Sequence, residues 1–376
     1  MRMLLLSSIF LFVSQATAQT KIPTFFTVVA QNFDKWDANK DGVISREETD
    51  DLVPKRSIQG VAAAALASLH LMQNNKKIDL PPVTRQYLQE QVARDGKPGQ
   101  PDFQRRYVNA WNKIKSSTRS LISGNITLES MHQGRMGDCY LIAPLGAMVA
   151  RNAGQVRGMF VESPGSGYGV RFADGHLVNV APLSDTELAI TGTTEGHGLW
   201  LGVLEKAISA AKREEVDDMK ETDSVAGAIG RGGSIARYIP LLTGHKGKVI
   251  NFHEKNSPPR AAEAKVKVNL TELRNELRQA MEDKRIVCCS TTTESGVPGL
   301  SSRHAYALLK YDAASDVVHL WNPHGNKFVP KGPAGLANGY PTVDGKFTVP
   351  VSQFVKAFRS VTLETPVKAT FQNTRK

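Results

Sequence analysis

The segment from Gln133 to Ile142 (Gln-Gly-Arg-Met-Gly-Asp-Cys-Tyr-Leu-Ile) constrains this chain more than any other part of its sequence. Its pattern predicts a helix that opens at Cys139. A helix N-terminus carries partial positive charge, which stabilises a thiolate, the reactive form of cysteine. Gln133, six residues earlier, supplies an N–H donor for an acyl oxygen that becomes negative during attack. The segment therefore predicts a thiol nucleophile with its oxyanion donor.

Two downstream runs supply partners for this cysteine. The run from Arg303 to Leu309 is apolar and partly aromatic, and a turn at 312–316 separates it from a second run, Val317 to Asn322. The two runs predict a β-hairpin. In such a hairpin His304, near the start of the first strand, lies close to Asn322, at the end of the second. A Cys-His pair oriented by an Asn carbonyl is one version of the nucleophile-base-orienter triad.

Five blocks of the sequence, in the same order, resemble the calpain family of cysteine proteases. The cysteine segment is similar to the family pattern QGxxGDCWLL, and the others are similar to FWxxLLEKAYA, GHAYS, NPWG and DGEFWMSFxDF. The matching segments here are Gln133–Ile142, Gly198–Ala207, His304–Ala307, Asn322–Gly325 and Asp344–Phe358.

The resemblance implies an α+β fold. A papain-like, calpain-like protease core, with a helical subdomain and an antiparallel β subdomain, would follow a small all-α domain. It makes Cys139 the nucleophile, His304 the general base and then acid, and Asn322 the residue that orients the imidazole. Gln133, with the backbone N–H of Cys139, would form the oxyanion hole. The activity implied is hydrolysis of peptide bonds through a thioester.

Several residues depart from the family pattern. Tyr140 replaces Trp after the cysteine, and Pro144 lies inside the expected helix, which predicts a later start or a bend. Arg303 stands in place of the Gly before the histidine. His324 replaces the Trp that shields the His-Asn hydrogen bond in relatives. We interpret it first as a plain turn residue, and Trp321 points to the opposite face.

A second motif predicts a calcium site in the N-terminal part of the chain. Residues 37–48 match a twelve-residue EF-hand loop, with a glycine for the sharp turn at position 6 and a glutamate at position 12. Apolar residues at helical spacing between Phe25 and Trp36 predict the helix that leads in. The predicted Ca²⁺ ligands are Asp37, Asn39, Asp41, the Val43 carbonyl, Ser45 through a water, and Glu48.

A partner for this EF-hand is not obvious in the sequence. The segment 95–102 lacks a closing glutamate, so we interpret it as a plain turn, and we expect the hand to pack on the alanine-rich helix of residues 61–69. The calpain core itself binds calcium through acidic residues. The matching positions here are Ser130 and Gly198, which carry no carboxylate, so that route is not expected.

The first eighteen residues predict a cleavable signal peptide, because Arg2 precedes a short apolar run and Ala16-Thr-Ala18 forms a small-x-small cleavage pattern. The protein is then secreted or periplasmic, without integral membrane association. The predicted domains are 1–18 signal peptide, 19–120 helical with one EF-hand, 121–365 catalytic, and 366–376 flexible tail.

Three cysteines in an exported protein exclude a disulfide framework, and Cys288 and Cys289 are predicted to be core residues on opposite faces of a strand. The net charge of +11 is spread along the chain without a basic stripe, which indicates a solvated surface and argues against a nucleic-acid partner. The resemblance to calpains implies a protein or peptide substrate. Neither composition nor motifs indicate an oligomeric state.

Three functions fit these patterns. The first is an exported, calpain-like cysteine endopeptidase with a calcium-binding EF-hand. The alternative is a calcium-binding interaction protein with an inactive protease fold, which His324 and Arg303 favour and the intact set of four site residues opposes. The third is acyl transfer to an amine, as in transglutaminases, which typically use Asp rather than Asn as the orienting residue.

Overall fold

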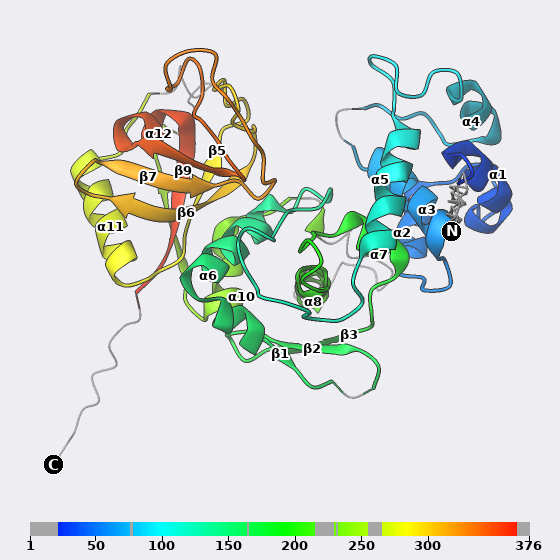
Figure 1. Cartoon of the computed structure of the whole chain (residues 1–376), viewed down its shortest axis with the longest axis horizontal. Coiled ribbons are helices and arrows are strands. Elements are labelled where there is room, and N and C mark those ends of the chain that lie inside the picture. Colours follow the sequence, from blue (N-terminus) through cyan, green and yellow to red (C-terminus); the bar gives the residue numbers. More distant parts are fainter. Residues whose placement is uncertain are drawn as a thin grey trace, which may run out of the picture.

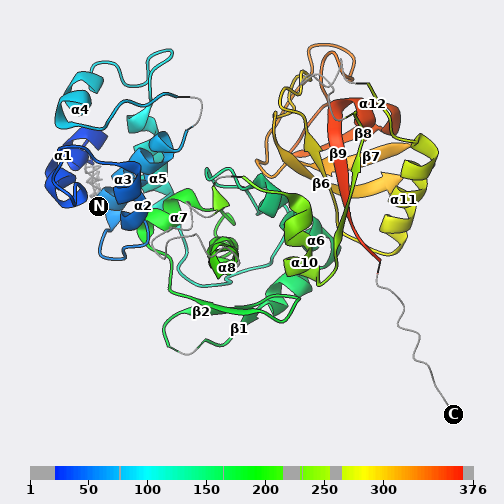
Figure 2. The same ribbon diagram turned by 180° about the vertical axis from the view of Figure 1, so that it is seen from behind.

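A computed structural model describes residues 22–75, 78–163, 165–214, 229–230, 232–254 and 265–366. The predicted signal peptide, residues 1–18, lies outside the described residues, as do residues 367–376 of the predicted tail. Three parts follow one another across the molecule: a group of helices near the N-terminus, a central mixed part and a β-sheet part (Figure 1). The same order is seen from behind (Figure 2).

The N-terminal part consists of short helices. Thr24 caps the first of them by accepting a hydrogen bond from the Thr27 N–H. The bounds of this helix confirm the one expected from Phe25 to Trp36, and the alanine-rich helix is also present. The helices are α1 (Phe25–Trp36), α2 (Arg46–Leu52), α3 (Gly60–Gln73), α4 (Arg85–Gln91) and α5 (Phe103–Ser116).

The loop between α1 and α2 has a partner that sequence reasoning missed. Val43 forms an antiparallel bridge with Thr84, and the Ile44 N–H donates to the Val83 carbonyl at 3.0 Å. The partner loop therefore joins α3 to α4, so the four helices form two helix-loop-helix units whose loops pair. The segment 95–102 is the plain turn we expected, in which Asp95 accepts the N–H groups of Phe103 and Gln104.

The central part surrounds the long helix α6 (Cys139–Gly158). A three-stranded antiparallel sheet in the order β1-β2-β3 lies beside it. The other elements are β1 (Phe160–Val161), β2 (Tyr168–Arg171), β3 (Leu177–Val180), α7 (Asp185–Ile190), α8 (Trp200–Glu214) and α10 (Ile235–Thr243).

A six-stranded antiparallel sheet in the order β4-β9-β5-β6-β7-β8 forms the last part. Helices α11 and α12 cover one face of this sheet, and α6 lies against the other (Figures 1 and 2). The elements are β4 (Gly247–Asn251), α11 (Leu270–Glu282), β5 (Val287–Thr291), β6 (Ala305–Asp312), β7 (Val317–Trp321), β8 (Lys346–Pro350), α12 (Val351–Ala357) and β9 (Phe358–Glu364).

The two cysteines of β5 lie on opposite faces of the sheet, as predicted. Both are free and fully buried. Cys288 belongs to a core that extends through α6 into the N-terminal helices, whereas Cys289 belongs to the core under α11 and α12. The N-terminal helices thus share apolar packing with the central part. The domain limits at residues 120 and 365 stay a prediction.

Helix α6 packs tightly against β7. A Cβ atom at Gly146 would lie 2.3 Å from Cζ3 of Trp321, so only glycine allows this approach. Trp321 is 1% exposed. The strand that ends beside Asn322 is therefore fixed against the helix that begins at Cys139, and this contact brings two distant parts of the sequence together.

Candidate active site

Cys139 is the first residue of α6 and follows the cap residue Asp138. The residue is half-buried, and the backbone N–H of Ala305 lies close enough to its sulfur to lower the pKa of the thiol. Burial raises the pKa of the Cys139 thiol to about 11. The backbone N–H groups of Cys139 and Tyr140, at the start of α6, lower this pKa and so act against burial. A thiolate requires a cation beside it.

The histidine of the expected hairpin lies next to that sulfur contact in the chain. His304 precedes Ala305, and its Nε2–H donates to Oδ1 of Asn322 at 2.8 Å. Burial and the neighbouring His324 lower the pKa of His304 to about 3. With Nε2 carrying the proton, Nδ1 is a free base. The amide of Asn322 is itself held by donation to Oδ1 of Asn326 at 2.8 Å.

His324 lies in the turn after β7, as expected, but it also has a contact that we did not predict. Its ring is stacked on that of His304, with ring centroids 4.6 Å apart and planes 9° from parallel. His324 itself is exposed. Trp321 points away and packs on α6, as expected. The imidazole of His324 thus covers one face of His304 and leaves solvent close by.

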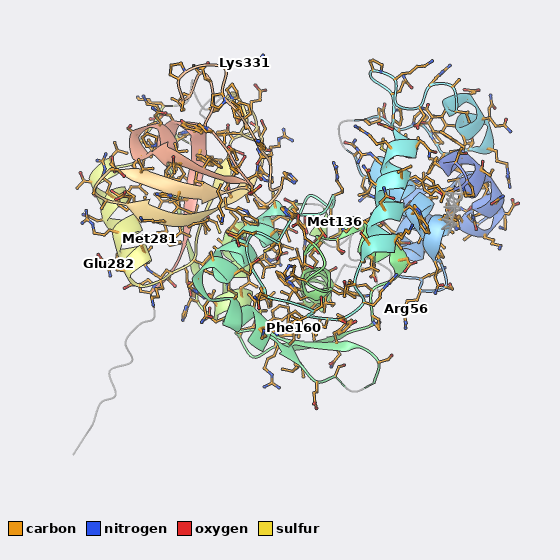
Figure 3. All side chains as sticks on the ribbon, in the orientation of Figure 1. Arg56, Met136, Phe160, Met281, Glu282 and Lys331 are labelled. Carbon is orange, nitrogen blue, oxygen red and sulfur yellow. The ribbon has the colours of Figure 1, made fainter. Side chains whose placement is uncertain are left out.

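Gln133 lies against the same turn. Its backbone N–H donates to the carbonyl of Pro323 at 2.8 Å, and its side-chain Nε2 donates to Oδ1 of Asp138 at 3.0 Å. These two contacts fix Gln133 between the turn after β7 and the start of α6. Met136 lies on the loop between Gln133 and Cys139, in the middle of the molecule (Figure 3). Described contacts thus connect all four predicted site residues, although their roles stay predictions.

The departures at Pro144 and Arg303 have local explanations. Helix α6 begins at Cys139 and passes through Pro144, and its non-helical residue is Asn152, so a later start is excluded. Arg303 adopts a left-handed backbone with φ of 49°, a conformation that suits glycine. Tyr140 is buried, and its hydroxyl donates to the carbonyl of Ile229 at 2.7 Å.

Sequence reasoning missed a group of buried charges behind Cys139. Asp138 and Glu205 are both fully buried, and their carboxyl groups lie close enough together for each to affect the charge of the other. The ammonium of Lys113, on α5, interacts with both. One signal was present in the sequence, because Glu205 follows an apolar run from Leu199 to Leu204 that predicts a buried helix face.

Comparison with protein families settles the class of enzyme. The family model described as calpain family cysteine protease matches residues 97–333. The chain belongs to the calpain family of cysteine proteases. It is a cysteine-type endopeptidase that acts on protein or peptide substrates. A comparison with curated proteins finds no match. The α+β architecture, with helices and antiparallel sheets, fits this calpain-family core.

The two positions that correspond to acidic calcium ligands in the calpain family are occupied differently here. A Cβ atom at Gly198 would lie 2.4 Å from the Leu121 carbonyl oxygen, and the residue has φ of 103°. Ser130 is 5% exposed, and its hydroxyl donates to the Thr127 carbonyl. No carboxylate fits at Gly198, because backbone fills the space that a side chain would need.

The loop of residues 37–48 in this calpain-family protease directs its oxygen atoms to its own backbone. Asp37 accepts the N–H groups of Asp41 and Gly42, and Glu48 accepts those of Ala38 and Asn39. Among the residues described, no three His, Cys, Asp or Glu side chains converge closely enough to hold a metal ion. The donor set is still all oxygen, which is the chemistry that Ca²⁺ requires.

None of the described helices combines the length and the apolar character that crossing a lipid bilayer would need.

Proposed function

We propose that the chain is an exported endopeptidase in which Cys139, His304, Asn322 and Gln133 hydrolyse peptide bonds. The observation that carries the proposal is the 2.8 Å hydrogen bond from His304 to Asn322, made by the residue next to the N–H that contacts the Cys139 sulfur. These contacts support a nucleophile, a base and an orienting amide that act together where the long helix α6 begins.

The reaction begins with proton transfer from the Cys139 thiol to Nδ1 of His304 as sulfur attacks the peptide carbonyl carbon. Burial disfavours each ion alone, so the thiolate and the imidazolium form together, each stabilising the other. The carbonyl oxygen becomes negative and accepts hydrogen bonds from Gln133 and the backbone N–H of Cys139. Asn322 keeps Nε2 occupied, so that Nδ1 carries the transferred proton.

His304 next protonates the leaving amine, and the C–N bond breaks to leave a thioester on Cys139. A water molecule then loses a proton to His304 and attacks the thioester carbon. The C–S bond breaks, the carboxylic acid product leaves and the thiol is restored. Each proton accepted by His304 is returned within one cycle, so the residue acts as base and acid in turn.

A thiol-directed epoxide tests this assignment on the mature protein. We expect a mass adduct on Cys139 alone, since Cys288 and Cys289 are fully buried and serve as internal controls. His304→Ala should abolish labelling, because the sulfur loses its proton acceptor. Peptide hydrolysis without incorporation of an added amine should distinguish this enzyme from an acyl transferase. Labelling that persists in His304→Ala would contradict the proposed pair.

We further propose that residues 37–48 bind Ca²⁺. Asp37, Asn39, Asp41, the Val43 carbonyl and Glu48 would hold the ion, with Ser45 acting through a water. Support comes from the all-oxygen donor set, from the turn at Gly42 with φ of 83°, and from the pairing of Ile44 with Val83. Paired loops are the arrangement in which EF-hands bury their apolar faces.

The calcium proposal is tested with Glu48→Gln and the exposed neighbour Glu47→Gln. Glu48 accepts the Ser45 N–H at 2.8 Å in a capping box, a contact that glutamine preserves while the charge is lost. We expect calcium to raise the melting temperature of the native chain and of Glu47→Gln, but not of Glu48→Gln. Equal calcium responses in both variants would refute the site.

Export follows from the predicted signal peptide, residues 1–18. The test is the N-terminal sequence of the protein recovered from outside the cytoplasm, which we expect to begin at Gln19. An uncleaved chain retained in the cytoplasm would refute export.

A further inference from the structure

Two carboxyl groups meet directly behind the proposed nucleophile. Asp138 and Glu205 are both 0% exposed. Oδ1 of Asp138 accepts the Gln133 amide at 3.0 Å. Its other oxygen, Oδ2, is buried and receives no hydrogen bond from an amide, hydroxyl or cation in the described part of the chain. The neighbouring group within hydrogen-bonding reach of the Asp138 carboxyl is the carboxyl group of Glu205.

Two ionised carboxylates do not remain in contact in a buried site, because their repulsion is not screened. One proton between them turns the contact into a hydrogen bond. Burial, with Asp138 as the next cause, raises the pKa of Glu205 well above its usual range. The Gly192 N–H lies 3.0 and 2.8 Å from the two oxygens of Glu205, and it holds that carboxyl group in place.

Lys113 supplies the neighbouring positive charge. It lies on α5, in the N-terminal helical part, and its ammonium donates to the Thr191 carbonyl. Burial lowers the pKa of Lys113 to about 8, although Glu205 and Asp138 act in the opposite direction. One proton on the acid pair leaves a single negative charge, which one ammonium balances.

We propose that Asp138 and Glu205 share one proton, and that this acid pair, balanced by Lys113, positions the Gln133 side chain for oxyanion binding. The inference rests on the proposed function, since it concerns how the oxyanion donor of that site is held. It adds three positioning residues, none of which touches the substrate.

Gln133 needs such an anchor because the oxygen and nitrogen ends of its amide have nearly the same shape. An amide can rotate so that either oxygen or nitrogen faces a given neighbour, and an oxygen directed at an oxyanion would repel it. Asp138 accepts one of the two protons on Nε2 and thereby fixes that end of the amide. The second proton of the same amino group stays available for the substrate oxygen.

The oxyanion role is tested by comparing hydrolysis with alkylation in the full-length chain. Iodoacetamide reacts with the Cys139 sulfur without forming an oxyanion, so it reports the nucleophile alone. Asp138→Ala should lower kcat by about 100-fold, as loss of an oxyanion donor does, with little change in KM and in the alkylation rate. Asp138→Asn should restore kcat, because its Oδ1 accepts from Gln133 and its Nδ2 donates to Glu205.

Two outcomes overturn the positioning role. An unchanged kcat in Asp138→Ala would show that Gln133 needs no anchor, and an equal loss in hydrolysis and alkylation would indicate general disruption of the site. If iodoacetamide modifies Cys139 in the native chain but the chain hydrolyses no peptide, the proposed function fails instead. The shared proton can then still be tested by the infrared measurement below.

The shared proton has a readout that does not depend on activity. The native protein at neutral pH should show the infrared C=O stretch of a buried carboxylic acid, and this band should vanish in Glu205→Gln. Glu187 is an equally buried control, but it is ion-paired with Lys206 at 2.8 Å. Glu205→Gln should barely change the melting temperature, whereas Glu187→Gln should lower it clearly. A band that survives in Glu205→Gln, or equal losses in melting temperature, would overturn the proposal.

Discussion

The rings of His304 and His324 are stacked, with centroids 4.6 Å apart, at the position where the calpain pattern has a tryptophan. The contact follows from the hairpin. Ala307 pairs with Trp321, His304 directly precedes the first strand, and His324 lies in the turn that follows the second. Both histidines therefore lie at the same end of the hairpin, where the stack places a second imidazole over the proposed base.

Replacing His324 with tryptophan should raise the pKa of His304. Burial is the largest cause that lowers this pKa, and the neighbouring His324 is the next. An indole keeps the stacking surface without a titratable group. The pKa is measured by following the His304 ring signal in an NMR pH titration. A value equal to or below that of the native protein would contradict this explanation. His176→Trp, at an exposed histidine, is the control.

The hairpin and the His304–Asn322 contact were predictable, but the stack was not. Apolar and aromatic runs separated by a short turn predict which strands pair. The register changes between Leu308 and Lys310 at a bulge, so counting back from the turn gives a register that is wrong by one residue. A bulge depends on the packing of the finished sheet, and no local pattern in the sequence announces it.

The partner loop and the acid pair were missed for different reasons. The loop between α3 and α4 pairs through the backbone of Val83 and Thr84, and backbone pairing leaves no side-chain signature.

Asp138 and Glu205 stand in segments that we matched as family patterns, so each residue was assigned to its own block. Their contact across 67 positions (205 − 138) is a property of the fold. Helices and motifs were local enough to predict, whereas long-range contacts of single polar groups were not.

Replacing Arg303 with glycine should stabilise the protein by about 1 kcal/mol. A left-handed backbone costs a residue with a side chain about 1–2 kcal/mol, and Arg303 has φ of 49°. The larger backbone entropy of glycine in the unfolded chain offsets part of this gain. The free energy of unfolding in urea measures the effect. Lys327→Gly, at an exposed position without positive φ, should destabilise. Destabilisation by both changes would contradict the strain at Arg303.

Acid should destabilise the native protein partly through His304. Its pKa is lowered to about 3 in the folded state, against about 6.5 in an unfolded chain. Between these values the unfolded chain binds more protons, so the free energy of unfolding decreases as pH falls from about 6.5 toward 3. From pH 7 to pH 5 the expected loss from this residue is about 2 kcal/mol.

The measurement compares urea unfolding at pH 7 and pH 5 for the native protein and for His304→Gln. The variant should lose less stability on acidification, whatever its absolute stability, because glutamine does not titrate. The exposed His176→Gln should retain the native difference. Equal acid sensitivity in His304→Gln and in the native protein would exclude a buried neutral imidazole at this position.

Replacing Gly146 with alanine should impair both stability and catalysis. The new Cβ would lie 2.3 Å from the ring of Trp321, and this indole is fully buried. Overpacking of this kind costs about 1–3 kcal/mol. Because Gly146 lies on the helix that starts at Cys139, and Trp321 directly precedes Asn322, the strain would also separate the nucleophile from the residue that orients its base.

Gly158, on the same helix with no atom within 4 Å of its Cβ position, is the matched control. Gly158→Ala should leave both properties unchanged or slightly raise stability. The melting temperature and the rate of epoxide labelling measure the two effects. If Gly146→Ala lowered the melting temperature but labelled at the native rate, the packing of α6 on β7 would contribute to stability without setting the geometry of the site.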